Sequence, residues 1–138
     1  MTAENKYELQ KYFVKIANIL NKSIIEQWNH ILLGMFIYQI NQEENKSIQC
    51  FYQNKIGEDY KDIQEVFWND DEGEEYFDDL VILLNDFHDF CKNYCDNWKI
   101  MTFELFNDGN YSVNFGYDVD YNYGTVYLEK WKSKYFKY

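Results

Sequence analysis

Apolar residues recur every three or four positions in three segments of the chain, which is the spacing of one helix face. The pattern predicts an amphipathic helix over residues 4–22, a second helix over about 74–96, and a short basic closing helix beyond Gly124. The apolar positions of these helices are Leu9, Phe13, Ile16 and Leu20, then Phe77, Leu80, Leu84, Phe87, Cys91 and Tyr94, then Leu128, Trp131 and Tyr135.

Alternating apolar and polar residues predict strands between the helices. Trp28 to Ile40 and Ile48 to Tyr52 alternate on either side of polar residues 41–46, which indicates a hairpin. Residues 62–68 are compatible with a third strand or one helical turn, and we favour the strand. Residues 98–106 and 110–117 flank an Asp-Gly pair that suits a tight turn, so a second hairpin is expected.

This order of elements predicts an α+β fold: an antiparallel sheet, made of a meander and a C-terminal hairpin, with the N-terminal, long central and short C-terminal helices packed on one face. The chain contains no Pro and only six Gly, so no linker divides it, and we expect a single domain over residues 1–138. Without an apolar stretch of membrane-spanning length, a cytoplasmic location is expected. Three cysteines, Cys50, Cys91 and Cys95, are interpreted as reduced core thiols.

Negative charge is concentrated in one segment. The net charge is −11, and residues 58–79 hold eleven acidic residues against Lys61 alone, which accounts for −10 of it. This charge disfavours direct binding to nucleic acid or anionic membranes and favours a basic protein partner. Like charges this close repel each other, so a cationic partner would relieve them. The predicted partner-binding residues are Asp70, Asp71, Glu72, Glu74, Glu75, Asp78, Asp79, Asp86 and Asp89.

Two metal sites are weaker alternatives. Oxygen ligands at Asp118, Asp120, Asn122 and Glu129 have calcium-loop spacing, although Gly124 is one position late for that motif. His88, Cys91 and Cys95 share a face of the second predicted helix and could bind zinc with Cys50 or His30, but no paired motif preorganises them. Packing in the core is the favoured interpretation of these thiols, and no cofactor is expected.

Catalysis is disfavoured. His30 and His88 are the only histidines, and neither lies in a recognisable catalytic turn. Close carboxylate pairs are unavoidable among 24 acidic residues and therefore indicate no particular chemistry. A small hydrolase remains the least favoured hypothesis, and we expect a protein that is not an enzyme.

The C-terminal half resembles a known family. The residues that carry the resemblance are Trp98, the run from Phe103 to Phe115 with its Asn-Asp-Gly turn, Tyr117-Asp118, and a lysine-rich helix bearing Trp131 and Tyr135. In these residues the chain is similar to the YezG-like immunity (antitoxin) proteins of bacterial polymorphic toxin systems. The resemblance implies a cytoplasmic protein that neutralises the nuclease domain of a secreted toxin by stoichiometric binding, without catalysis. A nuclease cleft is basic because it holds phosphates, so the acidic segment suits such a partner.

Overall fold

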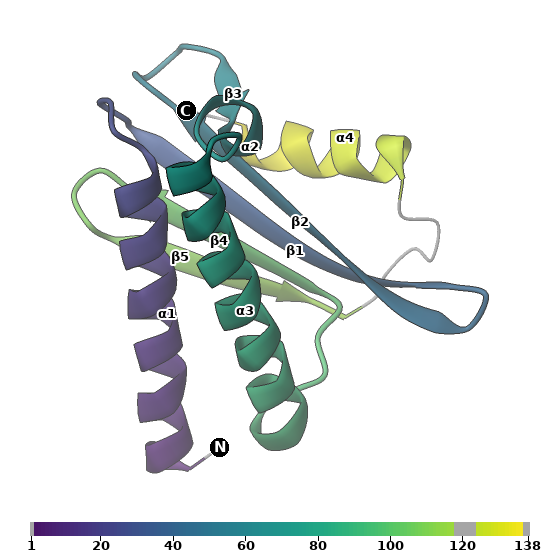
Figure 1. Ribbon diagram of the computed structural model, residues 1–138. Coiled ribbons are helices and arrows are strands. Elements are labelled where there is room, and N and C mark those ends of the chain that lie inside the picture. The colour runs from purple at the N-terminus through teal and green to yellow at the C-terminus, as the bar shows by residue number, and fades with distance from the viewer. Residues whose placement is uncertain (1, 118–123, 137–138) are drawn as a thin grey trace.

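The computed structural model describes residues 2–117 and 124–136. Within these ranges the chain forms four helices and five strands (Figure 1). In chain order they are α1 (Ala3–Ser23), β1 (His30–Ile40), β2 (Glu43–Gln53), β3 (Tyr60–Asp62), α2 (Ile63–Val66), α3 (Asp71–Tyr94), β4 (Ile100–Phe106), β5 (Tyr111–Gly116) and α4 (Thr125–Tyr135). The predicted α+β class and its three principal helices are confirmed. No helix in the described ranges has the length and apolar character needed to span a bilayer.

The strands form one antiparallel sheet in the order β3-β2-β1-β4-β5. β1 lies at its centre and pairs with β2 from His30 opposite Gln53 to Ile40 opposite Glu43. Only Asn41 and Gln42 form the turn, with φ of 52° and 69°. Two consecutive residues with positive φ match the twist of paired strands, which lets the pairing continue to the tip. The predicted turn over residues 41–46 was therefore too long.

The second hairpin is confirmed. β4 pairs with β5, and Gly109 adopts φ of 89°, a conformation that a residue with a Cβ rarely takes. The Gly109 N–H donates to the Phe106 carbonyl at 2.9 Å and closes the turn. The Asp-Gly pair thus had the structural role that the sequence indicated.

The favoured strand over residues 62–68 was wrong for most of that segment. β3 ends at Asp62, and α2 begins at Ile63 because the Asp62 carboxylate accepts a hydrogen bond from the Gln64 N–H at 2.9 Å. Ile63 then points into the core, while Val66 is exposed. The helix cap at Asp62 therefore outweighs the β propensity of Ile63 and Val66.

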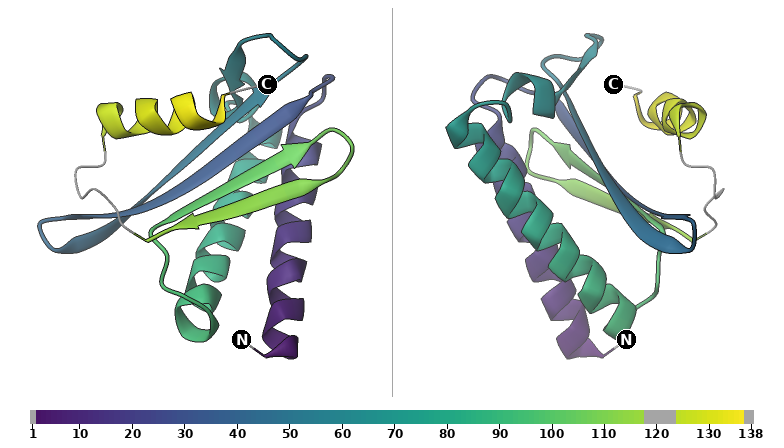
Figure 2. Two further views of the ribbon diagram at one scale, coloured as in Figure 1. Left: turned by 180° about the vertical axis from the view of Figure 1, so that it is seen from behind. Right: turned by 45° about the vertical axis from the view of Figure 1, so that its right-hand side comes forward.

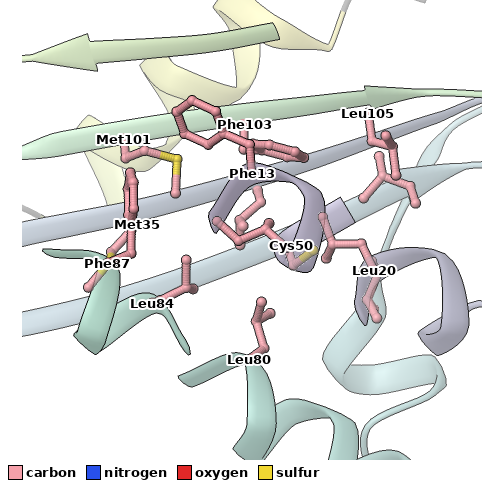
Figure 3. Close-up of a cluster of buried hydrophobic side chains, with 14 of the residues drawn as sticks. Phe13, Leu20, Met35, Cys50, Leu80, Leu84, Phe87, Met101, Phe103 and Leu105 are labelled. Atoms are coloured by element: carbon pink, nitrogen blue, oxygen red, sulfur yellow. The ribbon is translucent and has the colours of Figure 1, made fainter. Parts of the chain in front are cut away.

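α1 and α3 lie side by side on one face of the sheet (Figure 2). Their apolar stripes meet alternate residues of the strands, and Figure 3 shows Phe13 and Leu20 of α1 facing Leu80, Leu84 and Phe87 of α3 across this core. Tyr12 and Phe87 contact each other with ring centroids 5.5 Å apart. The two longest helices thus bury their apolar stripes in one shared cluster with the sheet.

α4 lies on the opposite face, so the expectation that all helices share one face was wrong for this helix (Figure 2). Leu32, Phe36 and Phe51 point away from the α1–α3 core, and Trp131 of α4 covers them. Gly34 makes this contact possible, because a Cβ at that position would lie 2.5 Å from Cζ2 of Trp131. The centre of β1 is apolar on both faces, and each face therefore needs a cover.

Candidate protein-binding surface

Asp70 and Gly73 determine where α3 begins. The Asp70 carboxylate accepts a hydrogen bond from the Gly73 N–H at 2.7 Å, which caps the helix. Gly73 packs so closely under the end of α2 that a Cβ there would lie 1.6 Å from the Phe67 carbonyl oxygen. Acidic residues in the first turn also favour the helix, since its N-terminus carries partial positive charge. These contacts determine where the acidic segment sits.

All nine predicted partner-binding carboxylates lie on exposed residues at the cap or along α3. We call this set the acidic face: Asp70, Asp71, Glu72, Glu74, Glu75, Asp78, Asp79, Asp86 and Asp89. At about 100° per residue, five of them fall within an arc of about 80° on the side away from the buried stripe. With a rise of about 1.5 Å per residue, Asp71 and Asp89 are separated by about 27 Å along the axis.

The acidic face has no neutralising cation among the residues that the structure describes, since no ion pair involves any of the nine. Two lysines lie near the C-terminal half of α3 without pairing to any of the nine. Lys46 Nζ donates to the Asn85 side-chain oxygen at 3.0 Å, and Lys92 Nζ lies 3.9 Å from the Glu44 carboxylate. Apart from the cap made by Asp70, the carboxylates therefore face solvent without an ion-pair partner in the described structure.

Ile82 interrupts the acidic face. It is 62% exposed and lies one helical turn from both Asp78 and Asp86. Ile82 was not among the predicted partner-binding residues, although its position in the helix indicates exposure: it is apolar but falls out of phase with the buried positions Leu80 and Leu84. An exposed apolar side chain ringed by charges is an arrangement typical of protein interfaces.

Asp96 does not belong to this surface. The second helix was predicted to reach residue 96, but α3 ends at Tyr94 and Cys95 is its C-cap. The Asp96 carboxylate instead accepts a hydrogen bond from the Tyr117 hydroxyl at 3.3 Å. It thus ties the end of β5 to the segment that follows α3.

The residues of the zinc hypothesis are largely buried in the core. The His88 ring lies against Trp98 with centroids 4.8 Å apart, and burial lowers its pKa. Burial also raises the pKa of Cys91 to about 12 and raises the pKa of Cys50 well above its usual value. These thiols stay protonated at neutral pH, which does not suit a nucleophile. Within the described ranges, no three His, Cys, Asp or Glu side chains are grouped to hold a metal.

Three of the four calcium candidates, Asp118, Asp120 and Asn122, lie outside the described residues. The fourth, Glu129, is on α4, where its carboxylate is 3.5 Å from Lys132 Nζ.

The comparison with known families covers nearly the whole chain: a family model described as "Immunity protein YezG-like" matches residues 9–138. The chain belongs to the YezG-like immunity protein family. The match extends from α1 through the sheet and α3 to α4, well beyond the hairpin and closing helix on which the sequence resemblance mainly rested. A search of curated proteins found no match. Membership of this family gives the chain an immunity role, and its partner is accordingly a cognate toxin.

Proposed function

We propose that this immunity protein neutralises the nuclease domain of its toxin by stoichiometric binding through the acidic face of α3. The observation that carries the proposal is a run of exposed carboxylates about 27 Å long with no ion-paired cation in the described part of the chain, in a member of an immunity family. Holding such charges together weakens a free protein, and a cationic partner removes that cost.

The charge also selects the class of toxin. A nuclease holds the phosphates of its substrate with lysine and arginine side chains, so its cleft carries positive potential. Complementary potentials steer two proteins together and raise association rates by factors of about 10 to 1,000. An immunity protein benefits from rapid association because it has to bind the toxin before the toxin reaches nucleic acid. Occupying or flanking the cleft would then block the substrate.

Different residues of the face serve different steps. The charges of Asp78 and Asp86 act at a distance and raise the association rate, whereas Ile82 between them provides apolar area that is buried only in the complex. Contacts at the centre of an interface, ringed by residues that exclude water, carry most of the binding energy. Ile82 is therefore the anchor, and the surrounding carboxylates guide it.

The test uses the toxin domain that co-purifies with the tagged protein from its host, with binding followed by surface plasmon resonance. Asp78→Lys combined with Asp86→Lys changes the net charge by +4. Asp59→Lys with Glu129→Lys makes the same change away from the face, on the loop before β3 and on α4. We expect the first pair to slow association at least about 10-fold at low salt and the second pair to have a much smaller effect.

Ile82→Ala provides the complementary readout. It should raise the dissociation rate about 5-fold or more and leave the association rate nearly unchanged, as expected for an interface anchor. Equal effects of the two charge pairs would overturn docking through α3. A cognate toxin domain that binds through α3 but does not cleave nucleic acid would overturn the nuclease assignment and leave the docking surface standing.

A further inference from the structure

α4 covers only part of its face of the sheet. It packs over β1 and β2 (Figure 2), and Trp131 reaches β4 through its hydrogen bond to Thr102. Between the helix and strands β4 and β5 lies a cleft of about 450 Å³. Its lining includes Thr102 and Asn114 from the sheet and, from the helix, Tyr127, Lys130, Lys134 and Tyr135. The cleft is thus polar and aromatic, with two lysines on its helix side.

The cleft adjoins an edge strand. β5 ends the sheet order and contains no charged residue and no Pro, the features that normally protect an edge from pairing. The Phe106 N–H donates to the Asn110 carbonyl, and hydrogen bonding alternates along an antiparallel pair. The N–H and C=O groups of Tyr111, Val113 and Phe115 therefore point away from β4. The structure shows no bond from them to any residue that it describes.

The lysines give this site a charge opposite to that of the chain as a whole. Lys130 and Lys134 are one helical turn apart and exposed, and neither is ion-paired within the described ranges. Lys132, between them, is paired with Glu129 at 3.5 Å. The Lys134 ammonium lies 5.4 Å from the centre of the Tyr135 ring, a contact that leaves its charge available to a carboxylate. A strand added to β5 would place alternate side chains on the cleft face of the sheet, where an acidic residue could reach Lys130 and Lys134.

We propose that this cleft receives an extended acidic segment of a partner protein, which adds to β5 as a sixth strand and places a carboxylate between Lys130 and Lys134. Main-chain hydrogen bonds to Tyr111, Val113 and Phe115 supply affinity, and the lysines supply specificity. The site lies on the opposite side of the sheet from the acidic face and is independent of it.

The net charge of −11 does not prevent an acidic segment from reaching this cleft. The outer side of α3 is separated from the cleft by the sheet and by a helix about 10 Å across. Charges are largely screened beyond about 8 Å at physiological salt. A second copy of the chain is a poorer occupant, because its own β5 would bring no carboxylate to the lysines, and two copies of like charge repel each other.

The probe is a synthetic strand-forming peptide, acetyl-Thr-Val-Glu-Val-Glu-Val-Thr-amide, titrated into ¹⁵N-labelled protein at physiological salt. The control peptide has Lys in place of both Glu. At about 2 mM, a concentration that detects millimolar complexes, the acidic peptide should shift the amide signals of Tyr111, Val113 and Phe115. The lysine peptide should shift them at least about 10-fold less at equal concentration, because Lys130 and Lys134 repel it.

Two sets of variants separate the contributions. Lys130→Glu with Lys134→Glu should reverse the peptide preference, whereas Lys6→Glu with Lys22→Glu on α1 makes the same charge change elsewhere and should preserve it. Val113→Pro removes an outward N–H without touching the bonds to β4, as edge strands tolerate, and should abolish binding. Val113→Ala controls for the lost side chain and should retain binding.

Unmoved β5 signals with the acidic peptide, or a preference that survives the Lys130 and Lys134 reversals, would overturn the proposal. A wild-type protein that sediments as a dimer and becomes monomeric with Val113→Pro would also overturn it, by making a second copy the occupant of the edge. The lysine reversals decide the question even if the proline variant does not fold.

Discussion

The two faces of the central strand differ in what covers them. Among the described residues, the α1–α3 face buries a cluster of twenty hydrophobic side chains, and the α4 face buries four. The smaller face also holds polar contacts: His30 is bonded to Tyr60 at 2.6 Å and to Glu104 at 3.1 Å, and Trp131 Nε1–H donates to the Thr102 hydroxyl at 3.0 Å. Stability is therefore concentrated on one face, and the other is free to keep an open cleft.

Leu32 and Leu33 are a matched pair for testing this difference, since they are neighbours in β1, both fully buried, and point to opposite faces. Leu33→Ala should lower the free energy of unfolding by about 3–5 kcal/mol because the dense cluster cannot close the cavity. Leu32→Ala should cost about 2–3 kcal/mol because α4 can settle toward the sheet. Chemical denaturation measures both, and equal losses would contradict the proposed division of stability between the faces.

Gly34→Ala tests the α4 face alone. The added Cβ collides with the Trp131 ring, so we expect a loss of about 1–3 kcal/mol and displacement of α4. The fluorescence of Trp131, read against a Trp131→Phe background, should change, while α1 and α3 stay packed. A Gly34→Ala protein with unchanged stability and unchanged Trp131 fluorescence would show that α4 can pack on the sheet without the space that Gly34 leaves for the Trp131 ring.

His88 should make the α1–α3 face sensitive to acid. Burial lowers its pKa in the folded protein, so the unfolded chain binds a proton more readily. Above pH 6.5, the ordinary pKa, His88 is neutral in both states and costs the folded protein no protonation energy. As pH falls from 6.5 toward the lowered pKa, the unfolded chain takes up the proton first and the free energy of unfolding decreases. The slope is at most about 1.4 kcal/mol per pH unit.

The measurement is a series of unfolding curves between pH 7 and pH 5 for the wild type and His88→Leu. The variant should lose this part of the pH dependence, whatever its absolute stability. If both proteins show the same slope, the titration belongs to other groups.

The smallest effects are expected on the acidic face itself. Asp70→Ala removes the cap of α3 and should cost about 1 kcal/mol. Asp78→Ala removes an exposed carboxylate without a partner in the described structure and should change stability by less than about 0.5 kcal/mol, or raise it slightly by reducing repulsion. Thermal melts would test the pair, and a large loss from Asp78→Ala would indicate a structural role for that residue.

Much of the fold could be predicted from periodicity, because the three long apolar stripes and the Asp-Gly turn are local signals. The side on which α4 packs could not be predicted from its own stripe, since a stripe shows that a helix is covered and not by which surface. The evidence was in β1, where Ile31 to Ile37 form an unbroken apolar run with Gly34 inside it. α2 was missed because four residues are too few to show a period.

For the candidate site, the exposure of Asp79, Asp86 and Asp89 follows from the same periodicity that predicted α3, because these residues fall opposite its apolar stripe. Ile82 was missed because a sequence pattern assigns apolar residues to the core by default. That the acidic face binds a toxin stays a prediction, since phase determines exposure and not the identity of a partner.

The central position of β1 has a consequence for synthesis. Its second neighbour is β4, and His30 pairs with Phe106. During translation β1 can form a hairpin with β2 early, but its other edge stays open until most of the chain has left the ribosome. Long-range pairing of this kind slows folding. A chain interrupted before residue 100 would therefore keep β1 as an unprotected sheet edge, and unprotected edges promote aggregation.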